Sequence, residues 1–313
     1  MPYLLSALVS FLIVAGLVPA LKKFALHKGF VDLPSARKIH HKPIPLMGGA
    51  AIYAGIVVTL FIFQGFTALS LTISSGGLIL VMIGLADDAA KSKGIDFPVW
   101  PRVLIYLAVS IIPLCFGIRI MGLSSPGGMV IFPSWLSVIG SIIWVFALIN
   151  MINFIDGVDG LASGVATLSS ITLFIVAIVK NQTDTALLAI IIAGACIAFL
   201  LYNFYPARIF MGDAGATFLG YVLAVIAVNG AFKSATLATV AIPLLALGVP
   251  ILDTVVVMLR RVISGKGLHR ADKLHSHHIL MRWGLNQIQT VAFIYLIAAL
   301  FSLLSIVLLL LRG

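Results

Sequence analysis

The stretch SLTISSGGLILVMIGLADDAAK, residues 70–91, decides the fold, because a long uncharged run ends directly in two adjacent carboxylates. Residues 70–86 have the length of a helix that crosses the hydrocarbon core of a bilayer, about 30 Å at 1.5 Å per residue. An ionised carboxylate near hydrocarbon costs roughly 2.5 to 3.5 kcal/mol even on a lenient insertion scale, so Asp87 and Asp88 need water, a metal or a polar substrate beside them. The stretch therefore predicts a membrane-spanning helix that ends at a functional site.

The whole chain has the composition of a membrane protein. Of its 313 residues 61% are hydrophobic and 10% are charged, and the mean hydropathy is +1.18. A water-soluble surface normally carries about a quarter charged residues, so this chain is predicted to span a membrane several times. Its apolar runs are continuous instead of alternating, which favours helices over a barrel and predicts an all-α polytopic protein.

Ten apolar runs of membrane-spanning length divide the chain. They lie near residues 2–21, 46–64, 70–86, 101–118, 135–149, 161–179, 185–202, 216–232, 236–258 and 289–311. No loop between them has the length of a folded soluble domain, so residues 1–313 are predicted to form a single integral membrane domain. Pro243, Gly248 and Pro250 interrupt the ninth run, and because each proline removes a helical hydrogen bond, a bend is expected there. The bend would carry Asp253 toward the site.

The basic residues predict the orientation. Sixteen of the 20 Lys and Arg residues lie in one set of loops, and the other set holds Arg119, Lys180, Lys233 and Arg312. The positive-inside rule makes the first set cytoplasmic and places both termini outside. The net charge of +10 is dispersed through loops that border the membrane, so anionic lipid and phosphorylated substrates are expected partners and nucleic acid is not.

All ten acidic residues are Asp, and nine of them fall at the ends of apolar runs on the predicted cytoplasmic side. Six are interpreted as one site: Asp87, Asp88, Asp156, Asp159, Asp213 and Asp253. Adjacent carboxylates repel, so Asp87 and Asp88 need a divalent cation or nearby cations to stay ionised. The alternative is a solvated helix end with ordinary charge pairing.

The run NMINFIDGVDGLA, residues 150–162, places polar side chains at every third position: Asn150, Asn153, Asp156 and Asp159. Side chains at this spacing share one helix face. Gly157 and Gly160 allow a bent backbone and the close approach of a ligand to main-chain amides. A capped helix end is the alternative, but four amide and acid groups in ten residues exceed what capping requires.

The run FMGDAGATFLG, residues 210–220, sets Asp213 between two glycines just before an apolar run. A glycine-flanked helix N-terminus favours a phosphate, and the Asp213 carboxylate offers oxygen to a hard cation such as Mg²⁺ that bridges to the phosphate. An N-capping Asp is the alternative.

The fifth cytoplasmic loop is rich in imidazole and charged side chains: His269, Arg270, Asp272, Lys273, His275, His277 and His278. We reject a zinc site, because no Cys or Glu accompanies these residues and their spacing does not match the i, i+4 helix pair of common zinc enzymes. Imidazoles mixed with Arg and Lys suit a phosphorylated, hydroxyl-rich substrate.

These motifs, in this order and on one side of ten predicted helices, resemble the polyprenyl-phosphate N-acetylhexosamine-1-phosphate transferases. The similarity runs from Gly29 to the end of the chain. GFVDLPSARKIHHKPIPLMGG, residues 29–49, together with RADKLHSHH, residues 270–278, looks most like the bacterial undecaprenyl-phosphate N-acetylglucosamine-1-phosphate transferases of the WecA/TagO type. The MraY branch differs in its first loop and in its His motif.

The resemblance implies transfer of N-acetylglucosamine-1-phosphate from UDP-GlcNAc to undecaprenyl phosphate at the bacterial cytoplasmic membrane, with release of UMP. The implied cofactor is Mg²⁺, or Mn²⁺ in its place, on Asp213 and Asn153. The implied catalytic acids are Asp87, which deprotonates or positions the lipid phosphate, with Asp88 and Asp156. The implied substrate contacts are Phe210 stacked on uracil, Gly157, Val158 and Asp159 at the uracil edge, Asn203 beside the nucleoside, and Lys38, Lys91, Arg270, His275, His277 and His278.

Two alternatives stay open on the sequence. A cation-coupled transporter also carries acids in membrane helices, although near mid-membrane. An enzyme of the same family could instead use UDP-MurNAc-pentapeptide or a modified hexosamine. A homodimer, and a role in starting a cell-envelope glycan such as teichoic acid or lipopolysaccharide, are further expectations.

Overall fold

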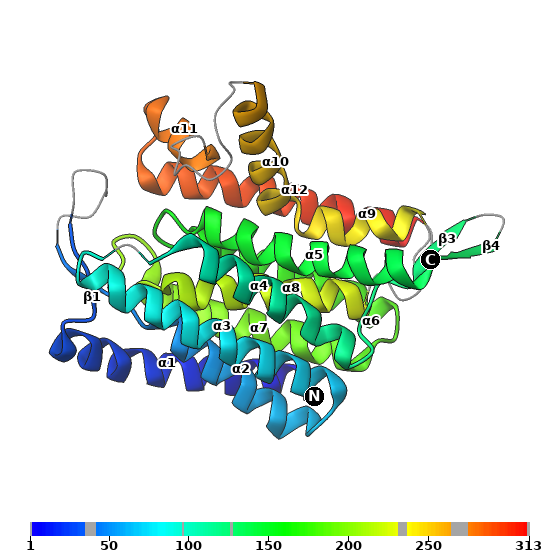
Figure 1. The fold of residues 1–313 in the computed structure, drawn as a ribbon, viewed down its shortest axis with the longest axis horizontal. Coiled ribbons are helices and arrows are strands. Elements are labelled where there is room, and N and C mark those ends of the chain that lie inside the picture. The colour runs from blue at the N-terminus through cyan, green and yellow to red at the C-terminus, as the bar shows by residue number, and fades with distance from the viewer. Residues whose placement is uncertain are drawn as a thin grey trace.

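The computed structural model describes residues 2–34, 42–95, 97–125, 128–230, 237–263 and 275–311, and the predicted substrate contacts Lys38 and Arg270 lie outside these ranges. Short loops join the helices of a bundle (Figure 1). The helices are α1 (Pro2–Lys28), α2 (Gly48–Gln64), α3 (Ala68–Ser92), α4 (Val99–Cys115), α5 (Ser134–Ile155), α6 (Leu161–Val179), α7 (Thr183–Asn203), α8 (Gly212–Gly230), α9 (Leu237–Ala246), α10 (Gly248–Ile263), α11 (Ser276–Arg282) and α12 (Gln287–Leu310). Two antiparallel strand pairs accompany them, β1 (Val31–Asp32) with β2 (Ile44–Pro45) and β3 (Gly122–Ser125) with β4 (Gly128–Ile131).

Each predicted apolar run coincides with helical structure, which confirms the α-helical membrane architecture. Among the described residues, seven helices are long and apolar enough to cross a membrane by length and composition: α1, α3, α5, α6, α7, α8 and α12. Helices α2 and α4 are apolar but have 17 residues each, about 25 Å at 1.5 Å per residue. The structure thus supports a polytopic membrane protein with fewer full-length spans than the ten expected.

The ninth apolar run forms two helices instead of one. Helix α9 ends at Ala246 and α10 begins at Gly248, and Figure 1 shows α10 leaving the direction of α9. Pro250 has no N–H to donate to the Ala246 carbonyl one turn back. That carbonyl instead accepts a hydrogen bond of 2.6 Å from Ser169 Oγ on α6. The missing donor and its replacement by a neighbouring helix explain why the run divides here.

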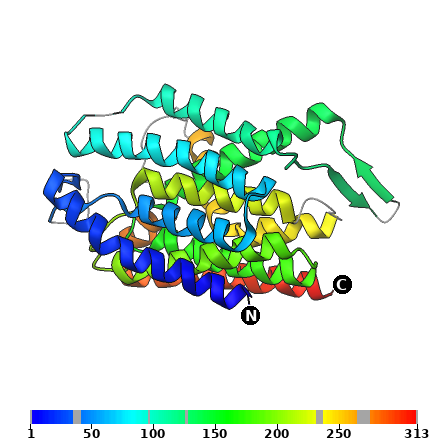
Figure 2. The same cartoon turned by 90° about the horizontal axis from the view of Figure 1, so that it is seen from below.

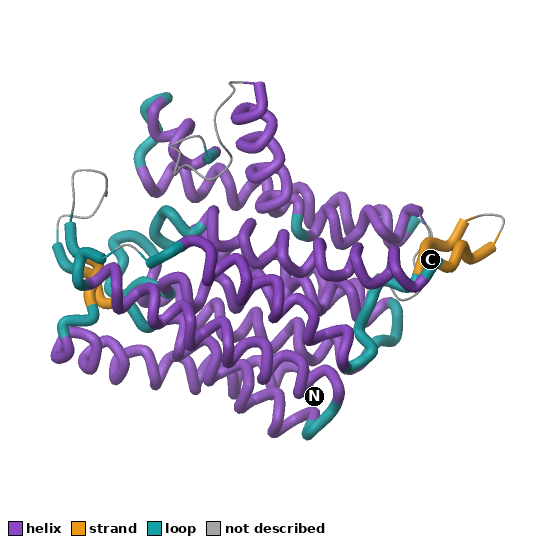
Figure 3. Tube along the Cα trace, viewed as in Figure 1, coloured by secondary structure: helices purple, strands orange, loops and turns teal. Residues whose placement is uncertain are grey.

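The two ends of the bundle differ. Helix α1 begins and α12 ends at the end that also carries β3 and β4 (Figures 1 and 2). The opposite end carries β1, β2 and the loops that follow α5 and α7, drawn as loop in Figure 3. The Asp87 and Asp88 pair and the two runs around Asp156 and Asp213 all come to this opposite end.

Helix α8 is buried along nearly its whole length and packs against α2, α3 and α5. Its approach to α2 depends on one glycine from each helix, because a Cβ on Gly49 would lie 2.1 Å from the backbone nitrogen of Gly215. Gly84 of α3 faces the backbone of Ala214 in the same way, at 2.3 Å. Small residues let membrane helices pack backbone to backbone. This packing brings the start of α8, with Asp213, beside the end of α3.

Gly49→Ala is expected to destabilise the protein, because its Cβ would meet rigid backbone of α8. Overpacking costs about 1 to 3 kcal/mol, so thermal unfolding of the detergent-solubilised protein should begin at a lower temperature. Gly16→Ala is the matched control, since a Cβ there meets nothing within 4 Å and alanine favours the helix. Equal unfolding temperatures for the two variants would contradict the packing argument.

Candidate active site

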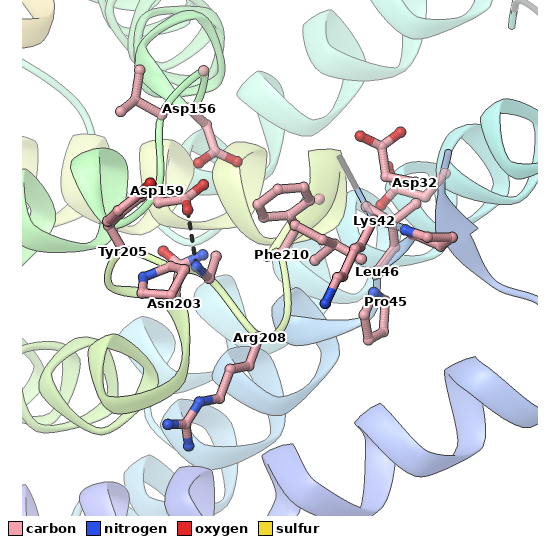
Figure 4. A pocket seen from close by; sticks show the side chains of 18 of the residues that line it. Asp32, Lys42, Pro45, Leu46, Asp156, Asp159, Asn203, Tyr205, Arg208 and Phe210 are labelled. Carbon is pink, nitrogen blue, oxygen red and sulfur yellow. Dashed lines mark hydrogen bonds between the residues drawn. The ribbon is translucent and has the colours of Figure 1, made fainter. Parts of the chain in front are cut away.

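A cavity of about 1030 Å³ lies among the loops at the end of the bundle opposite the termini. Ten residues predicted from the sequence line it: Asp88, Lys91, Asp156, Gly157, Val158, Asp159, Asn203, Phe210, Asp213 and His278. Figure 4 shows Asp156 and Asp159 on one side of the cavity, Asp32 and Lys42 on the other, and Phe210 between them. The structure thus brings together residues from all four motifs, which are far apart in the sequence.

Asp213, in the first turn of α8, is the centre of a network of ion pairs and hydrogen bonds. Lys91 Nζ donates to Asp213 Oδ2 at 2.6 Å, and Asn153 Nδ2 donates to Oδ1 at 3.1 Å. Asp87 belongs to the same network, because its Oδ2 lies 3.0 Å from Arg102 Nη1 and 3.2 Å from Lys91 Nζ. The Asp87 side chain is only 1% exposed, so these two cations supply the neutralisation that this buried carboxylate requires.

Two carboxylate oxygens of the pair remain without a donor. Asp87 Oδ1 and Asp88 Oδ2 are buried and accept no hydrogen bond within the described ranges. Asp88 Oδ1 accepts the backbone N–H of Asp213 at 3.3 Å. Gly212 makes this contact possible, since its φ is 68° and a Cβ would lie 2.1 Å from Asp88 Oδ2. The glycine before Asp213 therefore admits the Asp88 carboxylate, and not only a ligand as the sequence suggested.

The donor set fits a hard divalent cation shared with a substrate. In the part of the chain that the structure describes, no three His, Cys, Asp or Glu side chains converge to enclose a metal ion. Mg²⁺ is usually held by one or two carboxylates together with substrate phosphates and water. The Asp213 carboxylate, the neighbouring Asn153 amide and the unpartnered oxygen of Asp88 offer the oxygen ligands that such a site needs.

The expectation that Asn150, Asn153, Asp156 and Asp159 share one helix face is wrong. Helix α5 ends at Ile155, and residues 156–160 form a turn that leads into α6 at Gly160, whose φ is 78°. The Asn150 amide donates to the Phe146 carbonyl of its own helix at 2.7 Å. The two glycines of the run break the helix before the second half of the pattern is reached, and this turn places both acids at the cavity.

Two side chains join the loop after α5 to the loop after α7. Asp159 Oδ2 accepts the backbone N–H of Ala207 at 2.9 Å. Asn203 is 3% exposed, and its Oδ1 accepts from Gly160 N at 3.1 Å and from Ser163 Oγ at 3.2 Å. Its Nδ2 donates to the Ile209 carbonyl at 3.0 Å. Asn203 borders the cavity, but in this structure its amide fixes the relative position of the two loops.

The three histidines of the predicted substrate loop have different surroundings. His278 lines the cavity. His277 is buried against Gly157, and burial lowers the pKa of His277 to about 3, with His278 contributing repulsion. His275 precedes α11, and its Nδ1 lies 2.6 Å from Asp253 Oδ2. Only one of the three therefore faces the cavity in the structure.

Asp253 does not join the other five acids. Its Oδ1 accepts the backbone N–H of Ser276 at 2.6 Å, and its Oδ2 contacts His275, so both oxygens hold the start of α11. The division of the ninth run carries α10 away from the cavity and toward α11 (Figure 1). The interpretation of six acids as one site is thus corrected: four of them line the cavity, Asp87 is buried beside it on Lys91 and Arg102, and Asp253 lies at α11.

Several cavity residues were missed by reasoning from the sequence: Lys22, Asp32, Lys42, Tyr205 and Arg208, with Arg102 behind the carboxylates. Most were counted only as loop charges that set the orientation. Arg102 could have been predicted from the sequence, because a cation just inside an apolar run needs an oppositely charged partner as much as a carboxylate does. Asp87, one apolar run earlier, is that partner.

The fold and the site together are those of a membrane-embedded protein with a cavity of carboxylates and cations at one end of a bundle of apolar helices. Residues 70–231 match the family described as Glycosyl transferase family 4, and the chain belongs to this family. The matched range contains Asp87, Asp156 and Asp213.

Three relatives align along most of their length. The probable undecaprenyl-phosphate N-acetylglucosaminyl 1-phosphate transferase of Bacillus subtilis (strain 168) is 36% identical over 96% of this chain and 83% of its own. The undecaprenyl-phosphate alpha-N-acetylglucosaminyl 1-phosphate transferase of Escherichia coli (strain K12) is 32% identical over 90% and 77%. The decaprenyl-phosphate N-acetylglucosaminephosphotransferase of Mycobacterium leprae (strain TN) is 29% identical over 85% and 73%. The resemblance stated from the motifs is confirmed, and membership of this family excludes the transporter alternative.

Asp156→Asn is expected to stabilise the ligand-free protein more at pH 8 than at pH 5. Burial raises the pKa of Asp156 to about 7, and the carboxylates of Asp213 and Asp159 add to the rise. A carboxyl whose pKa is raised by folding favours the folded state at low pH, and this contribution is lost as pH rises through about 7. Asparagine stays neutral throughout, so thermal unfolding without added metal should show the difference. The exposed Asp184→Asn is the control, and equal gains at both pH values would contradict the assignment.

Proposed function

We propose that this chain transfers N-acetylglucosamine-1-phosphate from UDP-GlcNAc to undecaprenyl phosphate, giving undecaprenyl-diphospho-GlcNAc and UMP. The observation that carries the proposal is the Asp213 carboxylate, held by Lys91 and Asn153 at a cavity that also contains Phe210. The three relatives support it, since all are named as transferases of N-acetylglucosamine phosphate that act on undecaprenyl or decaprenyl phosphate.

The nucleotide is assigned to the part of the cavity formed by Phe210 and the loop after α5. The Phe210 ring offers a flat apolar face on which uracil can stack. The main chain of Gly157 and Val158 and the Asp159 carboxylate offer hydrogen-bonding groups for the edge of the base. The bond from Ala207 N to Asp159 keeps that carboxylate beside the loop that carries Phe210.

The diphosphate is assigned to the end of the cavity at Asp213, where Asp213 and Asn153 would hold Mg²⁺. When bound, Mg²⁺ would neutralise the negative charge that spreads over the phosphates during transfer. Lys91 adds a cation at the same place, and Arg102 stands behind it on Asp87. One divalent ion and two side-chain cations are the means by which phosphoryl transfer is normally catalysed.

The transfer breaks one P–O bond and forms another. An oxygen of the lipid phosphate attacks the phosphorus that bears the sugar, and UMP leaves with the electron pair of the broken bond. A phosphate monoester is already a competent nucleophile, so the protein mainly has to align the two substrates. Asp87 and Asp88 are assigned to the lipid phosphate, which they position or deprotonate.

The position of the cavity suits a lipid acceptor. The cavity lies at the ends of apolar helices, where a lipid phosphate is confined to the membrane surface. A separate apolar groove of about 160 Å³ lies beside α10 and α12, and Val249, Leu252, Ile297 and Phe301 are among its lining residues. His277 lines this groove and contacts Gly157 of the cavity, so an isoprenoid chain in the groove would run close to the carboxylates.

The purified protein is expected to release UMP from UDP-GlcNAc when undecaprenyl phosphate and Mg²⁺ are both present, and not when either is omitted. UDP-MurNAc-pentapeptide in place of UDP-GlcNAc tests the alternative donor. Asp213→Asn should abolish turnover in the same assay, because the amide is a much weaker ligand for Mg²⁺ than the carboxylate.

The control for Asp213→Asn is Asp184→Asn, which removes the same charge at the other end of the bundle and should leave UMP release unchanged. Both variants should elute as folded protein in size-exclusion chromatography. Near wild-type activity of Asp213→Asn at limiting Mg²⁺ would contradict the assignment of Asp213 as a metal ligand. Absence of UMP release by the wild-type protein would contradict the proposed reaction.

We further propose that the chain sits in the bacterial cytoplasmic membrane with ten crossings, both termini outside and the cavity facing the cytoplasm. The support is the excess of basic residues in one set of loops and the common end of the bundle at which α1 begins and α12 ends. This orientation gives the site access to cytosolic UDP-GlcNAc.

Cysteine labelling tests the orientation. In a background of Cys115→Ser and Cys196→Ala, the two cysteines of the chain are absent. Thr183→Cys, at the exposed start of α7, should react with an impermeant maleimide in intact cells or spheroplasts. Lys93→Cys, at the exposed end of α3, should react only after permeabilisation. The reverse pattern would overturn the orientation and the access to cytosolic nucleotide.

A further inference from the structure

Both oxygens of the Asp213 carboxylate already have partners. Oδ2 lies 2.6 Å from Lys91 Nζ and 3.6 Å from Arg102 Nη1, while Oδ1 accepts from Asn153. The Asp213 side chain is 18% exposed, so little of the carboxylate is left to water. The carboxylate proposed to hold a divalent metal is therefore already paired within the chain, Oδ2 with an ammonium group and Oδ1 with an amide.

An ammonium and a divalent ion repel each other on one oxygen. Mg²⁺ sits about 2.1 Å from its oxygen ligands, so an ion on Asp213 Oδ2 would lie within about 5 Å of Lys91 Nζ in its present position. Like charges at that separation, in a partly buried site, interact far more strongly than in water. Metal binding to Asp213 thus requires Lys91 to withdraw.

Lys91 has a second carboxylate to which it can withdraw. Asp87, one turn earlier on α3, has its Oδ2 3.2 Å from Lys91 Nζ. Arg102 holds the same Asp87 oxygen at 3.0 Å from α4, so Asp87 remains neutralised while Lys91 moves. Because Lys91 Nζ already contacts both carboxylates, a small rotation of its side chain would release Asp213 and keep Asp87.

We propose that Lys91 is an internal counter-ion of Asp213 that competes with the divalent metal and shifts toward Asp87 when the metal binds. This rests on the metal-dependent transfer proposed above. The competition weakens binding of metal alone. The diphosphate of the donor would give Lys91 a new anionic partner, so metal and nucleotide sugar should bind cooperatively.

The test is the affinity of the purified protein for Mn²⁺ alone, without nucleotide or lipid, followed by the electron paramagnetic resonance signal of free Mn²⁺. Lys91→Gln should bind Mn²⁺ about tenfold more tightly than the wild type, because a competing ion pair is gone. Lys91→Arg, which keeps the charge, should resemble the wild type. Lys93→Gln is the matched control, because it removes the same charge from an exposed side chain two residues further along the sequence.

The advantage of Lys91→Gln should vanish when UDP-GlcNAc is present, because Lys91 then helps to hold the diphosphate. Unchanged or weaker Mn²⁺ binding by Lys91→Gln alone would overturn the proposal, as would equal tightening by Lys93→Gln. Arg102→Gln is the second variant, to be used if Lys91→Gln does not fold. It should also tighten Mn²⁺ binding, because Lys91 would then be drawn to Asp87. Unchanged Mn²⁺ binding by Arg102→Gln would overturn the proposal. The UMP-release assay judges the proposed function separately.

Discussion

The structure depends on neutralising carboxylates where the helices meet the membrane surface. Asp87 and Asp88 are buried at the end of α3, and Asp213 faces them from the start of α8. Buried charges are stable only when paired and hydrogen-bonded, and removing one partner leaves an uncompensated charge. Lys91 and Arg102 provide that pairing for Asp87, and Lys91 also provides it for Asp213. The same arrangement gathers three carboxylates and two cations at one end of the bundle.

Helix packing is what brings these charges together. The glycines at positions 49, 84 and 215 let α8 approach α2 and α3 backbone to backbone, and Gly212 admits the Asp88 carboxylate. A Cβ at any of these four positions would lie only 2.1 to 2.7 Å from its nearest neighbour, so the packing around Asp213 and Asp88 would have to shift. Glycines that look like phosphate-loop residues in the sequence therefore also serve helix packing.

The fifth loop illustrates how one motif divides into different roles. His278 faces the cavity, His277 fills space against Gly157, and His275 pairs with Asp253 at the start of α11. Both oxygens of Asp253 on α10 bond the start of α11. The direction that α10 takes after α9 therefore determines where the His segment lies. His277 lines the apolar groove beside α12 and lies against Gly157 of the cavity, so the two hollows are neighbours.

The sequence by itself determined the membrane class, the helices, the family and ten of the 24 residues that line the cavity, because hydropathy, glycine placement and motif order can be read along the chain. It also located the metal-binding candidate at Asp213. Only the tertiary structure decided the partners: Lys91 reaches Asp213 from 122 positions away, and Asn203 joins two loops that are 43 positions apart. It also decided that α5 ends before Asp156 and that Asp253 leaves the site. Ion pairs and hydrogen bonds act over a few ångströms, and only the packing of the helices sets which distant residues come that close.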